Sequence, residues 1–426
     1  MIKNFDLLAN TKMERKALQI LESGLMAAQP KNFLKKFVNK NYISLGKDRI
    51  VLSKYRKIFV VAYGKAASSM AEYVVKKINI SKGIVVIPKN TKSSLISKKF
   101  VIIHAGHPIP DRESVKAGKT VQKFVESCSK EDFILFLVSG GGSSLLSLPD
   151  KITLDEKKRV TKLLLKSGAT IDEFNSVRKR LSRIKGGNLV KNMQSDGCAL
   201  IMSDVLTNNL SVISSGCTYN DNTTFSDAIK VITKYSLTKK LPKKVITHLK
   251  HGLKTQVTRP NRLKVKNKII ATNLDCLNTM AIKAKSLGIS TKIYSSVNDD
   301  VSTSAQKIVK MIKSSRKSCI IFGGESTVHV KGNGKGGRNQ ELVLQILKRI
   351  QNLDQNVLVS SISTDGIDGN TNYSGALIKN HSINLQKISS YLKNNDSNSF
   401  FKKYGGLIQT GSTNTNLMDI GLIIKY

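Results

Sequence analysis

Short apolar runs alternate with amphipathic stretches through the first half of the chain. Residues 57–63 form a β-branched run that ends in Gly64-Lys65 and is followed by small residues at helical spacing. Further apolar runs cover residues 83–88, 100–105, 133–139 and 198–205, with turns or helical patterns between them. Runs of this length are typical of buried strands, and repeated strand–loop–helix units predict a parallel sheet covered on both faces. Ligands bind such sheets at the carboxyl ends of the strands.

The same alternation resumes after a basic stretch over residues 235–268. There, residues 268–273, 274–288 and 290–295 predict a strand, a helix and a strand. Two more strands are expected, one ending at Gly323-Gly324-Glu325 and one over 327–332. A Gly-rich loop then precedes a helix over 341–350, and a strand over 357–364 ends at Asp365. We place a domain boundary near residue 241, which gives an N-terminal domain over 1–240 and a smaller C-terminal domain over 241–426.

Length and composition favour a two-domain globular enzyme. The chain has 426 residues, of which 40% are hydrophobic and 23% charged, and this length exceeds what one core usually supports. No apolar run reaches the roughly 18 residues of a membrane helix. The first 20 residues carry scattered charges, so we expect no secretory signal, a cytoplasmic location and no membrane partner. Five widely spaced cysteines argue against a zinc knuckle or a disulfide framework.

The histidines offer two close pairs, His104 with His107 and His248 with His251. The second pair lies in a basic helical stretch with no carboxylate nearby in the sequence. Metal sites usually combine histidine with cysteine or carboxylate ligands, so we interpret both pairs as ordinary surface or loop side chains.

The charge balance changes the expected surface. Seventy basic and 29 acidic residues give a formal net charge of +41, which invites a nucleic-acid interpretation. The lysines are dispersed in singles and pairs, however, and aromatic residues make up only 6%. We therefore expect a positive surface that attracts anionic small molecules and binds nucleic acid without specificity at low salt.

Three Gly-rich loops follow predicted strands and precede helical patterns: Gly64-Lys65, Gly140–Gly142 and residues 332–337. Glycine lets backbone amides turn toward an anion at the start of a helix. Lys65 and Arg338 lie in or beside two of these loops, where they are placed to meet a phosphate. None of the loops fits the P-loop pattern, the protein-kinase set or the dinucleotide fingerprint.

Acidic residues are scarce, which makes their positions informative. Asp204, Glu325 and Asp365 each follow an apolar, strand-like run. A carboxylate at such a position can hold Mg²⁺ or accept a hydroxyl proton, although Asp-Gly pairs at residues 365–366 and 368–369 are also common in turns. With Lys65 and Arg338, these acids make up a set suited to phosphoryl transfer.

Several long segments resemble one enzyme family. They are VAYGKAASSMA, AGHPIPD, FLVSGGGSSLLSLP, VRKRLSRIKGGNL, SDVLTNNLSVISSG, FGGESTVHVKGNGKGGRNQELVL, STDGIDGNT and TGSTNTN. In this order they are similar to the glycerate 2-kinases that carry a C-terminal MOFRL domain, from about residue 60 to residue 420. The resemblance implies a Rossmann-like N-terminal domain, a smaller α/β C-terminal domain and a catalytic cleft between them. It also implies ATP, a divalent metal such as Mg²⁺ and D-glycerate phosphorylated on its 2-hydroxyl, and a homodimer is possible.

The resemblance assigns individual residues. Position by position, it implies the catalytic residues Lys65, Asp204, Glu325, Arg338, Asp365 and Asn416. In the roles we assign, Lys65 and Arg338 neutralise the transferring phosphoryl group, and Asp365 is the base for the hydroxyl. Asp204 and Glu325 hold the metal or orient the substrate. The predicted cofactor-binding loops comprise Gly140, Gly141, Gly142, Ser143 and Ser144, and Gly334, Gly336 and Gly337.

The chain also departs from the family pattern. Residues 206–209 replace positions where acids are usual, Cys217 and Ser412 stand where proline is usual, and Asn414 replaces a glycine. Asn372 likewise stands where an acid is common. Loss of acids near the site predicts stronger anion binding, with a KM for glycerate that rises steeply with ionic strength.

Three other functions stay open at this point. One is a kinase for another small hydroxy acid, and one is a hydroxypyruvate reductase, which the absence of a dinucleotide fingerprint disfavours. The third is a nucleic-acid-binding protein on an inactive kinase scaffold, which retention of the six matched polar residues disfavours.

Overall fold

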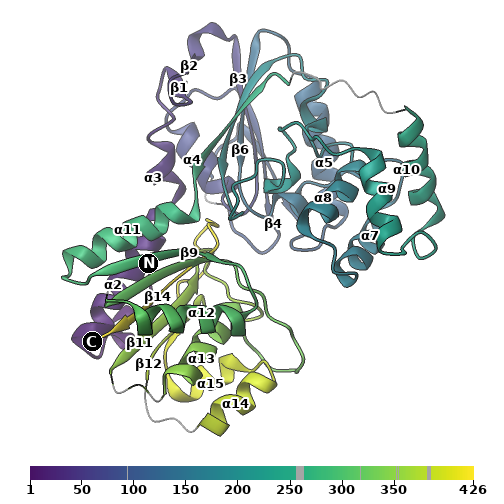
Figure 1. Cartoon of the computed structure of the whole chain (residues 1–426). Helices are drawn as coiled ribbons and strands as arrows, with labels where there is room; N and C mark the ends of the chain where they lie inside the picture. The colour runs from purple at the N-terminus through teal and green to yellow at the C-terminus, as the bar shows by residue number, and fades with distance from the viewer. Residues whose placement is uncertain (94, 256–262, 317, 352, 354, 381–384) are drawn as a thin grey trace. The chain divides into compact units, whose positions relative to one another are not determined.

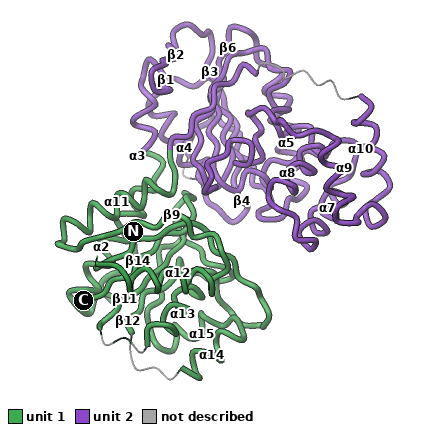
Figure 2. Tube along the Cα trace, in the orientation of Figure 1, with its two compact units in different colours: residues 1–32, 271–426 green, residues 33–270 purple. Residues whose placement is uncertain are grey.

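The chain forms two compact units, each with its own sheet and core. The computed structural model describes residues 1–426 except residues 94, 256–262, 317, 352, 354 and 381–384. Unit 1 comprises Met1–Asn32 and Ala271–Tyr426, and unit 2 comprises Phe33–Ile270 (Figure 2). The expected two-domain α/β organisation is confirmed.

The division between the units differs from the expected boundary near residue 241. Helix α10 (Lys243–Thr255) packs on α9 (Phe225–Lys234) within unit 2. Strand β8 (Val265–Ala271) then adds to the edge of the unit 2 sheet. The basic stretch is therefore part of unit 2, and the chain leaves this unit only after β8.

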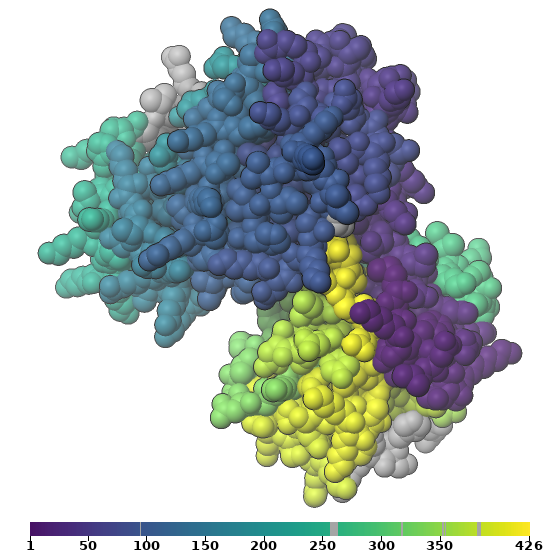
Figure 3. Space-filling model, turned by 180° about the vertical axis from the view of Figure 1, so that it is seen from behind, coloured from purple at the N-terminus to yellow at the C-terminus, as the bar shows by residue number. Residues whose placement is uncertain are grey.

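The N-terminal 32 residues belong with the C-terminal part of the chain. Helix α2 (Lys12–Ala27) packs on α11 (Asn273–Ser286) and on strand β14 (Asp419–Lys425). Gly24 allows this approach, because a Cβ there would lie 2.7 Å from the Ile420 side chain. The Lys3 N–H donates to the Gln409 carbonyl at 2.7 Å, and Figure 3 shows the N-terminal residues, in purple, against the yellow C-terminal ones.

Unit 2 contains a six-stranded sheet in the order β5-β4-β3-β6-β7-β8. Strands β3, β4 and β6 of this sheet are labelled in Figure 1. Strands β5, β4, β3, β6 and β7 pair in parallel, as the strand–loop–helix pattern predicts. The other elements of this unit are as follows: α3 (Pro30–Leu34, at its boundary), β1 (Tyr42–Ser44), β2 (Arg49–Val51), η1 (Leu52–Lys54), β3 (Lys57–Tyr63), α4 (Ala67–Val75), β4 (Lys82–Pro88), β5 (Phe100–Ala105), α5 (Arg112–Glu126), β6 (Asp132–Val138), α6 (Gly142–Leu145), α7 (Leu154–Lys166), α8 (Ile171–Arg180), η2 (Asn188–Val190), β7 (Asp196–Met202) and η3 (Ile213–Ser215).

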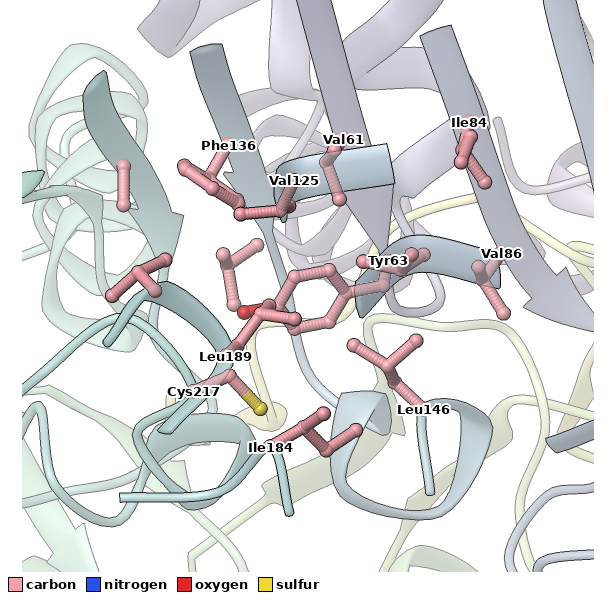
Figure 4. Close-up of a cluster of buried hydrophobic side chains, with 14 of the residues drawn as sticks. Val61, Tyr63, Ile84, Val86, Val125, Phe136, Leu146, Ile184, Leu189 and Cys217 are labelled. Atoms are coloured by element: carbon pink, nitrogen blue, oxygen red, sulfur yellow. The ribbon is translucent and has the colours of Figure 1, made fainter. Parts of the chain in front are cut away.

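Among the described residues, unit 2 contains one hydrophobic cluster against the sheet and another among its helices. The larger one lies against the sheet and includes Tyr63, whose ring is surrounded by aliphatic side chains such as Leu146 and Leu189 (Figure 4). The smaller one joins helices α7 to α10 through residues such as Phe174 and Leu249. The helical group therefore has its own core beside the sheet.

Unit 1 contains a mixed sheet in the order β13-β12-β11-β14-β10-β9. Strands β9 and β10 are parallel, and the other neighbours are antiparallel. Helices α2 and α11 pack on one another, and α12 and α13 form a second packed pair over the sheet core. The remaining elements are as follows: α1 (Phe5–Leu8), β9 (Thr291–Val297), α12 (Val301–Ser314), β10 (Cys319–Gly324), α13 (Arg338–Ile350), β11 (Val357–Ser363), β12 (Gly375–Lys379), α14 (Leu385–Lys393), α15 (Ser397–Tyr404) and β13 (Leu407–Ile408).

One predicted strand is wrong. Residues 327–332 form an irregular segment with a single bridge between Thr327 and Asp300. The backbone N–H groups of Lys331 and Gly332 donate to the Asn395 side-chain oxygen at 2.7 and 3.0 Å. These amides are thus satisfied by a side chain, and no neighbouring strand is needed.

The described residues also bear on the expectations about membrane-spanning helices and disulfides. In this part of the chain, no helix is long and apolar enough to cross a membrane. All five cysteines are buried and free of disulfides.

Candidate functional site

Three predicted site residues of unit 2 meet at the carboxyl edge of the parallel sheet. Lys65 follows β3, Gly141 follows β6 and Asp204 follows β7, and these three strands are neighbours. The Lys65 N–H donates to the Gly140 carbonyl at 2.9 Å. The Asp204 carboxylate accepts the Gly141 N–H and lies within electrostatic range of the Lys65 ammonium. The structure therefore brings together the lysine, the glycine loop and the acid that the sequence singled out.

Close approach of the first two loops explains why glycine stands at their tips. Gly64 has a φ of 125°, and a Cβ there would lie 2.2 Å from the Ser139 hydroxyl oxygen. That hydroxyl accepts the Ala66 N–H at 3.0 Å. Gly141 has a φ of 84° and its Cα faces the His107 ring and the Lys65 stem. A larger residue at either position would push the loops apart and move Lys65.

The carboxylate of Asp204 has an altered affinity for its proton. Burial raises the pKa of Asp204, and the Lys65 charge and the Gly141 N–H oppose that effect without cancelling it. A partly buried carboxylate next to a lysine is the environment in which enzymes hold a metal ion or transfer a proton.

The glycine loop is supported by Ser214, Ser215 and Lys185, which were not among the predicted site residues. Ser143 and Ser215 share a hydrogen bond of 2.7 Å between their hydroxyls, and Ser214 Oγ donates to the Ser139 carbonyl at 3.0 Å. Lys185, which is fully buried, donates to the Ser143 carbonyl at 2.8 Å. Burial lowers the pKa of Lys185 to about 8. Of the predicted loop residues, Ser144 uses its hydroxyl locally and donates to the Gly141 carbonyl at 3.1 Å.

The predicted residues of unit 1 surround a single arginine. Arg338, the first residue of α13, donates from Nε to Asp419 Oδ2 at 2.6 Å and from Nη2 to Asp419 Oδ1 at 3.1 Å. Its Nη1 donates to the Glu325 carboxylate. Burial alone would lower the pKa of Arg338, but the Asp419 and Glu325 carboxylates raise it above its usual range. The guanidinium is therefore held in a fixed, charged state.

Strand pairing explains why these groups meet. Asp419 begins β14, where it lies opposite Gly324 at the end of β10 and Ser363 at the end of β11. Glu325 follows β10 directly and Asp365 lies two residues after β11, so all three acids lie at one edge of the sheet. Asp419 was not predicted, because it opens an apolar run and looks like the solvent-facing end of a strand.

Asp365 lies in a tight turn after β11. Its Oδ1 accepts the Ser363 hydroxyl at 2.8 Å and the Ile367 N–H at 3.0 Å. The turn interpretation of this Asp-Gly pair therefore holds for the backbone. The turn leaves the Asp365 side chain partly exposed at the edge of the sheet.

Asp368 is structural. It is 1% exposed, and it accepts the N–H groups of Asn339 and Gln340 at 3.0 and 2.9 Å, which caps the start of α13. Burial raises the pKa of Asp368 to about 6 against the effect of these hydrogen bonds. This residue sets the position from which Arg338 extends.

Asn416 is the residue that only the resemblance indicated. It is 9% exposed, and its side-chain oxygen accepts the Met418 N–H at 3.3 Å. Nearby, the Thr364 hydroxyl donates to the Met418 carbonyl at 2.6 Å and accepts the Leu417 N–H at 2.8 Å. Asn416 thus shapes the segment that leads into Asp419, next to the end of β11.

The Gly-rich loop over residues 332–337 differs from the expected anion cradle. The Gly334 N–H donates to the Asn394 carbonyl at 2.9 Å, and the Gly336 N–H donates to the Asn370 side chain at 3.0 Å. A Cβ on Gly337 would lie 2.3 Å from the Asp368 carboxyl group. These contacts favour a packing role for Gly334, Gly336 and Gly337, because amides that serve the fold do not face a ligand.

The residues present fit a metal ion that is bound mainly by the phosphates of a substrate, with few ligands from the protein. Among the described residues, no group of three or more His, Cys, Asp or Glu is arranged to hold a metal. Magnesium is commonly bound by one or two carboxylates together with substrate phosphates and water. Asp204 matches that use better than Glu325, whose carboxylate is engaged by Arg338.

Comparisons with known proteins identify the family. A domain of unknown function (DUF4147) matches residues 16–250, and the MOFRL family matches residues 318–419. The chain is 36% identical to a D-glycerate 2-kinase of Thermotoga maritima, over 97% of this chain and 99% of that protein. It is 34% identical to a glycerate 2-kinase of Pyrococcus horikoshii, over 90% and 92% of the two chains. The crystal structure of a glycerate kinase from Thermotoga maritima superposes with a TM-score of 0.81 at 33% identity, covering 97% of this chain and 99% of that chain. This chain therefore belongs to the family of glycerate 2-kinases that combine a DUF4147 region with a MOFRL region.

Proposed function

We propose that this chain transfers the γ-phosphoryl group of ATP to the 2-hydroxyl of D-glycerate, giving 2-phosphoglycerate and ADP. One observation carries the proposal. Lys65, the Gly141 N–H and Asp204 converge at the carboxyl edge of the unit 2 sheet, at the positions that match the family motifs. The near full-length similarity to proteins named glycerate 2-kinase supports the substrate.

The residues of unit 2 suit the nucleotide side of the reaction. The Lys65 ammonium would neutralise the transferring phosphoryl group, whose oxygens carry negative charge throughout the transfer. Asp204 would hold a divalent cation such as Mg²⁺ on the ATP phosphates, and that cation supplies further charge neutralisation. The loop over residues 140–144 would contact a phosphate or the glycerate carboxylate.

The residues of unit 1 suit the step in which the glycerate hydroxyl accepts the phosphoryl group. The 2-hydroxyl oxygen of glycerate attacks the γ-phosphorus, the bond from that phosphorus to the β–γ bridging oxygen breaks, and ADP leaves. Asp365 would accept the proton of the hydroxyl. Arg338, oriented by Asp419 and Glu325, would stabilise the equatorial oxygens of the phosphoryl group.

The contacts within unit 1 bear on two predicted roles, that of Glu325 as a metal ligand and that of the glycines over 334–337 at the nucleotide. Glu325 contacts Arg338 and orients it, and its predicted role as a metal ligand stays a prediction. The amides of Gly334 and Gly336 donate hydrogen bonds within unit 1, and the predicted role of Gly334, Gly336 and Gly337 at the nucleotide stays a prediction. Asn416 would position the segment before Asp419, next to the turn that carries Asp365.

A coupled assay tests the proposal. ADP release from ATP is followed with Mg²⁺ and D-glycerate, and the product is resolved by ³¹P NMR as 2- or 3-phosphoglycerate. Glycerate-dependent formation of 2-phosphoglycerate supports the assignment. Turnover with a different hydroxy acid but not with D-glycerate would retain the kinase chemistry and reject the substrate. NADH oxidation with hydroxypyruvate would instead favour a reductase.

A further inference from the structure

His107, which lies in the turn after β5, contacts the glycine loop of unit 2. A Cβ on Gly141 would lie 3.0 Å from both Cδ2 and Nε2 of His107, and 3.4 Å from Lys65 Cγ. The edge of the imidazole that carries Nε2 therefore faces the tip of the loop. The Gly141 N–H also donates to the Asp204 carboxylate, so the tip is where His107, Lys65 and Asp204 come together. The interpretation of this histidine as an ordinary surface or loop side chain does not explain that contact.

The strand order alone does not bring His107 to this loop. Strands β5 and β6 are separated by β4 and β3, which amounts to three strand spacings, or about 14 Å. The turn over residues 106–110 and the loop after β6 must together span that distance across the carboxyl ends of the two strands between them. A turn that only joined β5 to α5 need not reach so far. His107 thereby lies at the edge where parallel sheets bind their ligands.

The turn that carries His107 is closed by an ionised side chain. The Asp111 carboxylate accepts the N–H groups of Gly106 and Ser114 at 3.1 and 2.9 Å, so it joins the two ends of the turn. It also pairs with the Lys89 ammonium. Burial would raise the pKa of Asp111, but the Lys89 ammonium and these N–H groups lower it to about 2. The carboxylate therefore stays ionised near neutral pH, and the backbone on both sides of His107 is held.

The same anchor is bonded to the segment that follows the glycine loop. The Ser147 N–H donates to the Ser114 carbonyl at 3.1 Å. Gly118 of α5 allows this approach, because a Cβ there would lie 2.5 Å from the Ser147 carbonyl oxygen. Helix α5 therefore supports both the turn with His107 and the end of the loop region. This shared support fixes the contact between the imidazole and the loop.

The chemistry of the imidazole suits an anionic ligand at this place. The His107 side chain is exposed, so a ligand at the loop can reach it. A histidine ring carries at least one N–H donor in either protonation state. Lys65 already places a cation beside the same loop, and an N–H donor next to it suits a negatively charged oxygen, since hydrogen bonds to charged groups are roughly twice as strong as neutral ones.

We propose that His107 is a further substrate-binding residue of the reaction, whose Nε2–H donates to an anionic oxygen at the tip of the glycine loop. This inference rests on the proposed function, because the oxygen belongs either to a phosphate of ATP or to the carboxylate of D-glycerate. The two sources share one chemistry, and the substrate whose binding weakens on loss of the donor identifies which of them contacts the ring.

Variants at two positions separate a hydrogen-bonding role from a packing role. His107→Gln keeps an N–H donor close to the position of Nε2. His107→Phe keeps a flat ring against Gly141 but has no donor. The matched control is His104→Phe, at an exposed histidine within β5 that is not among the groups nearest to Gly141. Thermal unfolding of each variant checks that the fold is kept.

Steady-state kinetics with ATP, Mg²⁺ and D-glycerate give the main readout. We expect His107→Phe to raise KM for one of the two substrates about tenfold or more with little change in kcat, because a hydrogen bond to the bound substrate is lost. His107→Gln should stay within about threefold of the wild type. Kinetic constants in His107→Phe equal to those in His104→Phe, or equal losses in His107→Phe and His107→Gln, would overturn the inference.

Calorimetric titration of the same proteins with ATP and with D-glycerate requires no turnover. If the wild type binds either ligand but forms no phosphoglycerate, the proposed function fails. A Kd raised about tenfold in His107→Phe but not in His107→Gln would still support the role of His107 in that case. Normal turnover in the wild type, with unchanged KM and Kd values in His107→Phe, would reject that role and leave the proposed function in place.

Discussion

Arg338 and Asp419 form a two-point ion pair, with Nε 2.6 Å from Oδ2 and Nη2 3.1 Å from Oδ1. The Asp419 side chain is 9% exposed, and strand pairing on both sides fixes its backbone. A planar guanidinium held at two points cannot rotate, so its remaining nitrogen keeps a defined direction. The pair therefore controls where the positive charge of Arg338 acts.

Replacing Asp419 should reduce catalysis through Arg338. In Asp419→Asn we expect kcat to fall about 100-fold with little change in KM for ATP, since a misdirected cation no longer stabilises the transferring group. Arg338→Lys should have a similar effect, because a lysine cannot form the two-point contact. Steady-state kinetics of both single variants and of the double variant measure this coupling. Multiplicative losses in the double variant would show that the two residues act independently.

Lys65 should contribute to the chemical step. We expect Lys65→Ala to lower kcat by about 10²- to 10³-fold, because it removes positive charge beside the transferring phosphoryl group. Lys65→Arg keeps the positive charge but changes the shape and reach of the cation, so it tests position as well as charge. The matched control is Lys77→Ala, an exposed lysine of the same unit. Equal activity in Lys65→Ala and Lys77→Ala would remove Lys65 from the mechanism.

Asp204 should determine how activity responds to acid. Burial raises the pKa of Asp204, so the carboxylate becomes protonated at a higher pH than an exposed aspartate, whose pKa is about 3.9. If the ionised form is needed, kcat/KM falls as pH decreases, with a midpoint above about pH 4. The pH profile of kcat/KM checks this. An acid limb that persists unchanged in the residual activity of Asp204→Asn would assign the titration to another group.

Asp368 should make the free energy of unfolding depend on pH in the opposite sense to most acidic side chains. Its pKa is raised to about 6 in the folded chain, so the folded state binds the proton more tightly than the unfolded state does. The resulting stabilisation is fully present below about pH 4 and is lost as pH rises through about 6, with an upper bound of about 3 kcal/mol.

Urea unfolding of the wild type and of Asp368→Asn, at pH 4.5 and pH 7.5, measures this contribution. The wild type should exceed the variant by more at pH 4.5 than at pH 7.5. The same difference at both values would contradict the assigned ionisation.

Local sequence patterns predicted unit 2 well because its strands are continuous apolar runs. Strands β3 and β5 begin and end where the pattern places them, and the loops after β3, β6 and β7 carry the predicted lysine, glycines and acid. A parallel sheet buries both faces of each strand, so the signal is strong. The general rule for strand ends predicts Lys65 and Asp204 at the same edge of the sheet, whereas the order that makes β3, β6 and β7 neighbours was not predicted.

Contacts between distant segments could not be predicted in the same way. Nothing local indicates that α2 packs on α11 and β14, or that Asp419 pairs with Arg338 across 81 positions of the chain. The predicted strand over 327–332 failed because the Asn395 side chain satisfies its amides. Likewise, the glycines over 332–337 suggested an anion site, whereas their amides donate to residues near 370 and 394.

The measurement that tests the central claim most directly is single-turnover phosphoryl transfer from ATP to D-glycerate, with the product identified by ³¹P NMR. The wild type should form 2-phosphoglycerate, and Lys65→Ala and Arg338→Lys should form it at least about 100-fold more slowly while Lys77→Ala retains the wild-type rate. Formation of 3-phosphoglycerate, or no glycerate-dependent product from a folded chain that binds ATP, would contradict the proposed function.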